Sequence, residues 1–221
     1  MSAIAPTVYI VDDVREVRMA LSRLLGASGY QVSAFESAER FLLEQDAEAP
    51  GCLLLDVCMP GLSGIELQRT LAGSPCERPI VFLSVKGDVD IGVHAMKEGA
   101  VDFLTKPIDH ARLVAAVEQA LKRDAEQRRE RDIRRMIRER LEALTPREHQ
   151  VMVQVIHGRL NKQIAVGLGT GEKTVKVHRA RVMSKMGAHS VAELVQLAAR
   201  VGVAIEPALG VDTATLNWKQ A

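Results

Sequence analysis

Five short and almost wholly apolar segments alternate with helical patterns through the first 120 residues, and this alternation limits the fold more than any other feature. The segments are rich in β-branched residues and leucine, as buried strands are; they are residues 8–11, 32–35, 52–55, 80–83 and 101–104. Parallel strands need crossover helices, which cover both faces of the sheet. The pattern predicts an α/β domain, residues 6–120, with a doubly wound, five-stranded parallel sheet.

The net charge of +1 hides an asymmetry between the two parts of the chain. Residues 1–120 contain 10 Lys and Arg and 17 Asp and Glu, a net charge of −7, whereas residues 121–221 contain 19 and 11, a net charge of +8. An acidic part suits a metal cation, and a basic part suits the phosphate backbone of DNA or another polyanion. We therefore expect the two parts to bind different partners.

The chain contains no apolar run of about 18 residues that would span a bilayer, and its start lacks the features of a signal peptide. We therefore expect a cytoplasmic protein with no membrane partner. Its three cysteines, Cys52, Cys58 and Cys76, are odd in number and lack metal-ligand spacing, which favours reduced thiols.

A helical linker is predicted between the two parts, over residues 121–143. This segment contains no Pro or Gly, and residues 122–132 are almost wholly charged. Pairs such as Asp124 with Arg128 have the i,i+4 spacing that supports a solvated helix. The linker is therefore expected to continue the last helix of the sheet domain.

A small all-α domain is predicted over residues 144–203. It opens at Thr145-Pro146-Arg147-Glu148, which combines an N-cap residue, a proline at the first helical position and a capping-box glutamate. Asn161 is expected to cap a second, short helix, and residues 172–186 form a third. The tail, residues 204–221, has no clear periodicity and is expected to be mobile.

Polar side chains follow four of the predicted strands. Asp12 and Asp13 follow the first strand, Asp56 ends the third, Ser84 ends the fourth, and Lys106 follows the fifth. Parallel strands bring these positions to one edge of the sheet. Carboxylates can hold Mg²⁺ while another carboxylate attacks a phosphoryl group, whose oxygens a hydroxyl and an ammonium would bind.

These residues lie in motifs that resemble the receiver domain of two-component response regulators, a flavodoxin-like fold. The motifs are VDD at Val11, LLLDVCMPGLSG at Leu53, FLS at Phe82 and DFLTKP at Asp102. The resemblance implies that Asp56 is phosphorylated and that Mg²⁺ is bound by Asp13, Asp56 and the main-chain carbonyl of Cys58, with Asp12 assisting through water. Ser84 and Lys106 would contact the phosphoryl group.

Three positions of the receiver motifs raise further expectations. Phe103 stands at the aromatic switch position of such receivers, although a strand aromatic is equally consistent with a core role. Val85 and Lys86 stand where a small residue and a His or aromatic residue are common in the family. These two departures predict narrower access to Asp56.

The helix predicted over residues 172–186 has two different sides. Val175, Val182 and Met186 cluster on one side, whereas basic and small residues lie broadly opposite. Residues 145–200 contain 9 Lys and Arg against 3 Glu, a net charge of +6. A short helix, a glycine turn and a second helix with a basic face are typical of a helix-turn-helix that enters the major groove.

The second part resembles the LuxR-type DNA-binding domain of response regulators. Its motifs are LTPREHQVMVQVIHG, LNKQIAVGLG and KTVKVHRARVMSKMG. The resemblance places Lys176, Val177 and Ala180 nearest to base edges. Its candidate backbone contacts are Lys162, Lys173, Thr174, His178 and Arg181. Gly171 stands where a Ser or Thr cap is more usual, which weakens the start of this helix.

Together these resemblances imply a phosphorylation-dependent transcriptional regulator. Its expected partners are a sensor histidine kinase, double-stranded DNA, RNA polymerase and, after phosphorylation, a second copy of the chain. The receiver would catalyse only its own phosphoryl transfer and hydrolysis. A magnesium-dependent phosphohydrolase using Asp56 and a ligand-sensing transcription factor are the alternatives. The first lacks a DxD motif after the acceptor strand, and the acidic residues argue against the second.

Overall fold

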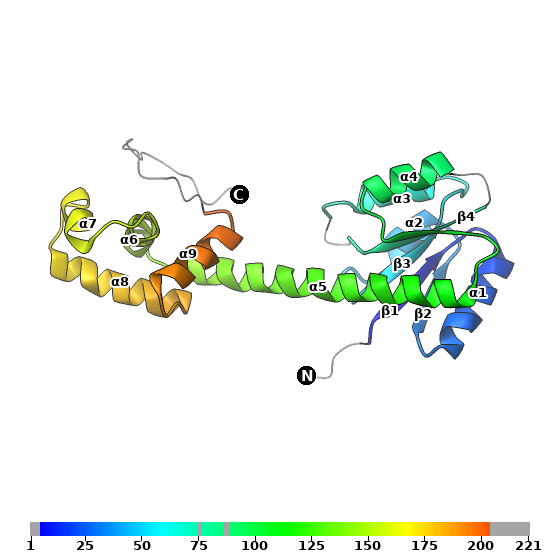
Figure 1. The fold of residues 1–221 in the computed structure, drawn as a ribbon, viewed down its shortest axis with the longest axis horizontal. Helices are drawn as coiled ribbons and strands as arrows, with labels where there is room; N and C mark the ends of the chain where they lie inside the picture. The colour runs from blue at the N-terminus through cyan, green and yellow to red at the C-terminus, as the bar shows by residue number, and fades with distance from the viewer. Residues whose placement is uncertain (1–4, 75–76, 86–88, 204–221) are drawn as a thin grey trace. The chain divides into compact units, whose positions relative to one another are not determined.

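A computed structural model describes residues 5–74, 77–85 and 89–203, which belong to two compact units, residues 1–129 and 130–221 (Figure 1). Cys76, Lys86 and the tail expected to be mobile lie outside the described residues. Within the described part, no helix is both long and apolar enough to cross a membrane.

The first unit contains the predicted five-stranded sheet, and all four of its strand pairs are parallel in the order β2-β1-β3-β4-β5. Its strands are β1 (Thr7–Val11), β2 (Gln31–Phe35), β3 (Gly51–Asp56), β4 (Ile80–Ser84) and β5 (Asp102–Thr105). Four helices connect them, namely α1 (Arg15–Ala27), α2 (Ala38–Glu44), α3 (Gly64–Leu71) and α4 (Val89–Lys97). The predicted doubly wound fold is confirmed.

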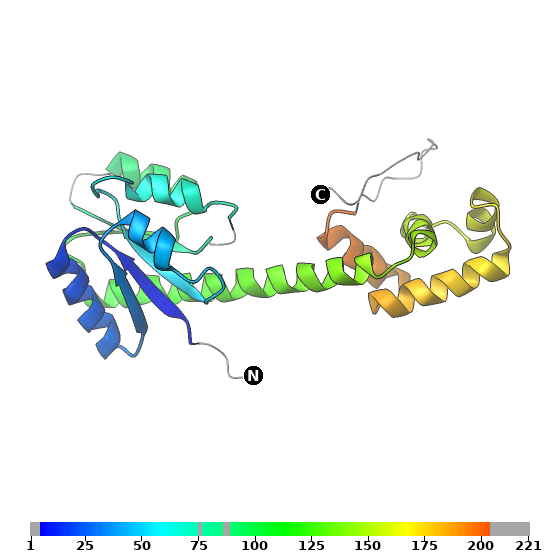
Figure 2. The same ribbon diagram turned by 180° about the vertical axis from the view of Figure 1, so that it is seen from behind.

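Both faces of the sheet are covered because alternate strand side chains face opposite layers (Figure 1; reverse view in Figure 2). On one face, Tyr9 and Val11 pack with buried residues of α2, α3 and α4. On the other, Val8 and Ile10 pack with α1 and with α5 (His110–Glu142). The strand ends are thereby held between two apolar layers.

Helix α5 differs from the expected solvated linker at Asp124 and Arg128. Asp124 is 1% exposed and accepts a hydrogen bond from Gly51 N at 2.9 Å. Arg128 Nε lies 3.0 Å from Asp124 Oδ2, and Arg128 Nη1 donates to the Glu48 carbonyl at 2.8 Å. The prediction of a solvated pair is therefore wrong, because the segment before β3 covers this face of α5.

The second unit contains α6 (Pro146–Ile156), α7 (Asn161–Gly167), α8 (Glu172–Met186) and α9 (Val191–Arg200). Its core also includes Ile137 of α5, which is fully buried among residues of these helices. The expected linker, residues 121–143, is thus divided between the two units, whose boundary lies after Arg129.

The N-terminal end of α6 has the predicted cap, whereas that of α7 does not. The Thr145 hydroxyl accepts from Glu148 N at 3.3 Å, and Glu148 Oε2 accepts from Thr145 N at 2.9 Å, so the predicted capping box is confirmed. Asn161 is not the cap of α7 but its first residue, and Leu160 precedes it. The Asn161 side chain instead accepts a hydrogen bond from Arg179.

Candidate functional site

The carboxyl ends of the strands bring the polar residues singled out above to one edge of the sheet. Asp12 and Asp13 directly follow β1, Asp56 and Ser84 end β3 and β4, and Lys106 follows β5. The register pairs Val11 with Leu55, and Asp56 with Leu83. Because the strands are parallel, their ends meet at the same edge.

Lys106 joins two of the carboxylates at this edge. Its Nζ lies 2.7 Å from Asp12 Oδ2 and also contacts Asp56 Oδ1. Asp12 is fully buried and Asp56 is 6% exposed. The three groups carry two negative charges and one positive charge in surroundings where water screens them poorly. The cluster therefore has an excess negative charge that suits a cation.

Main-chain groups fix the directions of the two carboxylates. Asp12 Oδ1 accepts from Val14 N at 2.9 Å, and Asp56 Oδ2 accepts from Cys58 N at 3.0 Å. Gly64 allows α3 to begin against the end of β3, since a Cβ there would lie 2.2 Å from the Asp56 carbonyl oxygen. The position of Asp56 thus depends on backbone packing around it.

Burial raises the pKa of the Asp56 carboxyl above its ordinary value. The hydrogen bond and charge of Lys106 act in the opposite direction, and the charge of Asp12 adds to the effect of burial. Burial lowers the pKa of the Lys106 ammonium, but its bonds to Asp12 and Asp56 outweigh burial, so this pKa is raised. The cluster therefore strongly favours a protonated lysine.

The remaining residues proposed for this site differ in exposure. Ser84 is 2% exposed, and its hydroxyl donates to the Val85 carbonyl at 3.2 Å. Asp13 is exposed, as is Val85, of which 60% is accessible. Phe103 is partly buried, with its ring centroid 6.3 Å from that of Phe82. The structure thus leaves the carboxylate of Asp13 accessible from outside.

The donor set at this edge fits Mg²⁺ by its chemistry, since it consists of carboxylate and carbonyl oxygens. Among the described residues, no three His, Cys, Asp or Glu side chains are grouped closely enough to hold a metal by themselves. The expected set needs only two direct side chains, those of Asp13 and Asp56, because its other protein ligand is the Cys58 carbonyl. The described geometry is compatible with that set.

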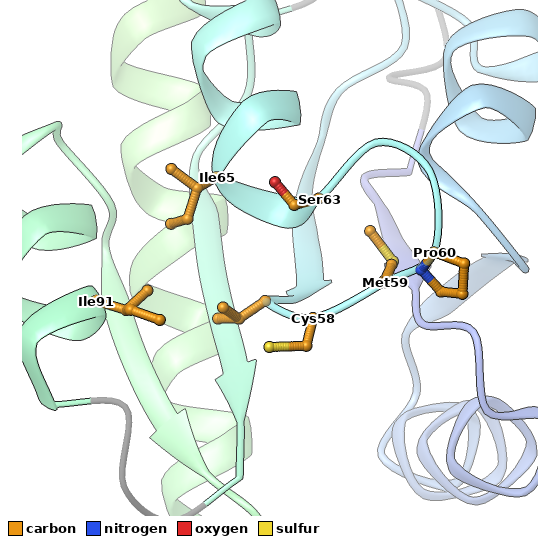
Figure 3. A pocket seen from close by; sticks show the side chains of 7 residues that line it. Cys58, Met59, Pro60, Ser63, Ile65 and Ile91 are labelled. Carbon is orange, nitrogen blue, oxygen red and sulfur yellow. The ribbon is translucent and has the colours of Figure 1, made fainter.

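An open hollow of about 530 Å³ lies beside the loop after β3 (Figure 3). Cys58 is exposed and its side chain lines the hollow, together with Val57, Met59, Pro60, Ser63, Ile65 and Ile91. The Cys58 main chain faces Asp56 through its N–H. The main chain of Cys58 therefore binds Asp56, whereas its side chain lines the hollow.

Helix α8 of the second unit has one buried and one exposed side. Val175, Val182 and Met186 are fully buried, as the spacing predicts. Seven of the eight expected DNA-contact residues are exposed, and they are Lys162, Lys173, Thr174, Lys176, Val177, Ala180 and Arg181. His178 is half-buried, and its Nδ1 is buried without a hydrogen-bond partner among the described residues.

Lys185 of this unit is exposed, but its ammonium binds groups of its own domain. Lys185 Nζ lies 2.6 Å from Glu148 Oε2 and donates to the Ala143 carbonyl at 2.9 Å. The hydrogen bond from Lys185, followed by the one from Thr145 N, lowers the pKa of Glu148 to about 2. The charge count of the domain did not reveal these roles. Gly171, before α8, provides no side-chain cap.

Comparison with known proteins gives a family match for each unit. Residues 8–118 match the response regulator receiver domain, and residues 142–198 match the bacterial regulatory proteins of the luxR family. The chain is 44% identical over 200 residues to the transcriptional regulatory protein FixJ of Azorhizobium caulinodans. This match covers 89% of this chain and 93% of that protein.

Two further relatives match across most of the chain. The response regulator protein TodT of Pseudomonas putida is 42% identical over 206 residues, 93% of this chain and 91% of TodT. The low-resolution structure of the response regulator StyR is similar with a TM-score of 0.78 and 44% identity, and the match covers 89% of this chain and 99% of that chain.

Proposed function

The chain belongs to the response regulators that join a receiver domain to a LuxR-type DNA-binding domain, and we propose that Asp56 is its phosphoacceptor. A sensor histidine kinase supplies the phosphoryl group, and phosphorylation controls the binding of α8 to promoter DNA. The observation that carries this proposal is the contact of Lys106 with both Asp12 and Asp56 at the strand ends.

The residues around Asp56 suit phosphoryl transfer to a carboxylate. An Asp56 oxygen forms a bond to phosphorus while the bond from phosphorus to the donor's leaving atom breaks, and the leaving group keeps the electron pair. With a phosphohistidine donor, the released ring nitrogen takes up a proton. Lys106 favours the ionised Asp56 and then pairs with phosphoryl oxygens, to which the Ser84 hydroxyl donates.

Asp13, Asp56 and the Cys58 carbonyl would hold Mg²⁺, with Asp12 acting through water. When bound, the ion neutralises charge that develops on the transferred phosphoryl group. The exposure of Asp13 supports this assignment, because its carboxylate is accessible to an incoming ion. The receiver catalyses only its own phosphorylation and hydrolysis.

The exposed side of α8 supports the DNA-binding part of the proposal. Lys176, Val177 and Ala180 approach base edges in the major groove. The phosphate backbone is contacted by Lys162, Lys173, Thr174, His178 and Arg181, of which all but the half-buried His178 are exposed. Binding at a promoter activates transcription through RNA polymerase, and the phosphorylated protein binds as a homodimer.

Mass spectrometry of the intact protein after treatment with acetyl phosphate and Mg²⁺ tests the acceptor. We expect the unchanged protein to gain one phosphate and Asp56→Asn to gain none. Asp132→Asn is the matched control, because Asp132 is exposed on α5 and should leave labelling intact. A stable phosphate on Asp56→Asn would refute the assignment.

A further inference from the structure

Arg179 lies on the packing side of α8, apart from the exposed basic residues. It stands four residues after Val175 and three before Val182, both fully buried, so the helical spacing places it on their side. Arg179 is half-buried, and its Nη1 donates to Asn161 Oδ1 at 3.1 Å. The guanidinium is therefore used within the domain.

The bond between Arg179 and Asn161 joins α7 and α8 at a distance from their connecting turn. Asn161 is the first residue of α7, whereas the turn, residues 168–171, follows its last residue. At about 1.5 Å of rise per residue, both Asn161 and Arg179 lie roughly 9 to 11 Å along their helices from the turn. Ile164 of α7 is buried in the same apolar core as Val175 and Val182 of α8. Helix α7 is thus fixed to α8 at both ends.

The angle between α7 and α8 decides how their DNA-facing residues fit one duplex. Lys162, next to Asn161 on α7, is a backbone contact candidate, whereas Lys176 and Val177 on α8 face base edges. Contacts to phosphates set the register of a protein on DNA, and contacts to base edges read the sequence. A change in this angle therefore disturbs base reading without removing any charge from the DNA-facing surface.

We propose that Arg179 is a positioning residue for sequence recognition, which acts through Asn161 and does not contact DNA. This inference rests on the proposed DNA-binding function. It separates Arg179 from Arg181, which stands two residues later on the same helix and is exposed. The two arginines should respond differently to the same substitution.

The test compares two duplexes, one selected by the full-length phosphorylated protein from random DNA and one of the same length and composition in scrambled order. Asn161→Ala removes the bond without changing the charge, and we expect it to lower the preference for the selected duplex by about tenfold, as loss of one good base contact does. The slope of log affinity against log salt concentration should stay unchanged.

Arg179→Met should reproduce this loss of preference, and the double variant should lose no more than either single variant. Asn161→Asp retains an acceptor for Arg179 and should keep the preference. In the matched control, Arg181→Met should weaken binding to both duplexes alike and reduce the salt slope by about 1, as expected for a phosphate contact. If Arg179→Met does not fold, the preference of Asn161→Ala for the selected duplex tests the proposal by itself.

Two results would overturn the inference. An unchanged preference in Asn161→Ala would mean that the bond does not position α8. A reduced salt slope with unchanged preference in Arg179→Met would mean that Arg179 contacts phosphate. If the unchanged protein preferred no duplex, the proposed sequence-specific DNA binding itself would be wrong. That result differs from a failure of the Arg179 proposal alone, in which the unchanged protein still prefers the selected duplex.

Discussion

At the scale of single residues, the receiver keeps a buried carboxylate at a cost in stability. Asp56 is nearly buried beside the fully buried Asp12, and among the described residues one ammonium, that of Lys106, contacts both. Burial of a charge without full compensation opposes folding. Sites of this kind commonly trade stability for function.

Asp56→Asn should therefore stabilise the protein at pH 7 without Mg²⁺, by about 1 kcal/mol. A carboxyl whose pKa is raised on folding destabilises the folded state above that pKa, and this penalty disappears as the pH falls below the unfolded-state value of about 4. Urea unfolding at several pH values measures the difference, which should vanish toward pH 4. A lower free energy of unfolding for Asp56→Asn than for the unchanged protein at pH 7 would contradict the prediction. The control variant Asp132→Asn should change this free energy little.

Glu148 shows the opposite dependence on pH. Its pKa is lowered to about 2 from an ordinary value of 4.5, so its contribution to stability is fully present above 4.5 and is lost as the pH falls toward 2. Glu148→Gln should lower the free energy of unfolding by about 1 kcal/mol at pH 7, since it weakens both a cap and an ion pair.

Circular dichroism during urea unfolding, from pH 7 down to pH 3, measures this difference. The difference in free energy of unfolding between Glu148→Gln and the unchanged protein should become smaller as the pH falls over that range. Glu193→Gln is the control, because Glu193 is half-buried and accepts a hydrogen bond from His189 N but pairs with no lysine among the described residues. A gap independent of pH would show that the charge of Glu148 does not matter.

At the scale of elements, α5 owes its attachment to the first unit to more than apolar contacts. Ala116, Val117 and Ala120 are buried against the sheet. One turn further, Asp124 accepts a hydrogen bond from Gly51 N at the start of β3, and two turns further Arg128 donates to the Glu48 carbonyl. These contacts extend the attachment of the helix beyond its apolar stripe.

Arg128→Met should destabilise the protein by about 3 kcal/mol, because it leaves the buried Asp124 carboxylate without its cation. Arg134→Met is a matched control on the same helix, since its pair with Glu130 has the same spacing but is exposed. That variant should cost no more than about 0.5 kcal/mol. If Arg128→Met and Arg134→Met lowered the stability equally in thermal unfolding, the pair of Asp124 and Arg128 would be screened by water to the same degree as a surface pair.

At the scale of the whole molecule, phosphorylation is expected to shift a population of monomers toward dimers. A phosphoryl group adds about two negative charges at Asp56, and a site made of two half-sites rewards pairing. The family resemblance places the dimer surface on α4 and β5, and the exposed apolar side chains of Val93 and Met96 lie on α4.

Sedimentation of the full-length protein with and without acetyl phosphate measures this shift, and operator affinity should rise with it. Asp56→Asn should remain monomeric under both conditions. A phosphorylated protein that stays monomeric and gains no affinity would disprove the prediction. If the unphosphorylated receiver instead inhibits DNA binding, a fragment of the second unit should bind the operator better than the unphosphorylated full-length protein. This fragment should begin at Glu130, because Ile137 belongs to the core of the second unit.

The sequence by itself determined the elements and the edge at which the polar residues meet. Apolar segments alternating with helical patterns are a local property, and they place Asp56, Ser84 and Lys106 at strand ends in any parallel sheet of this kind. The capping box at Thr145 is equally local, since its hydrogen bonds join residues three apart.

Only the tertiary structure decided which helix faces are covered and which charges are used internally. Asp124 has the i,i+4 partner typical of a solvated helix, but it is buried and binds Gly51 N, 73 residues earlier in the chain. Arg179 likewise finds its partner 18 residues away, at Asn161. Helical periodicity fixes the direction of a side chain on its own helix, whereas its burial and partners depend on packing between segments distant in the sequence.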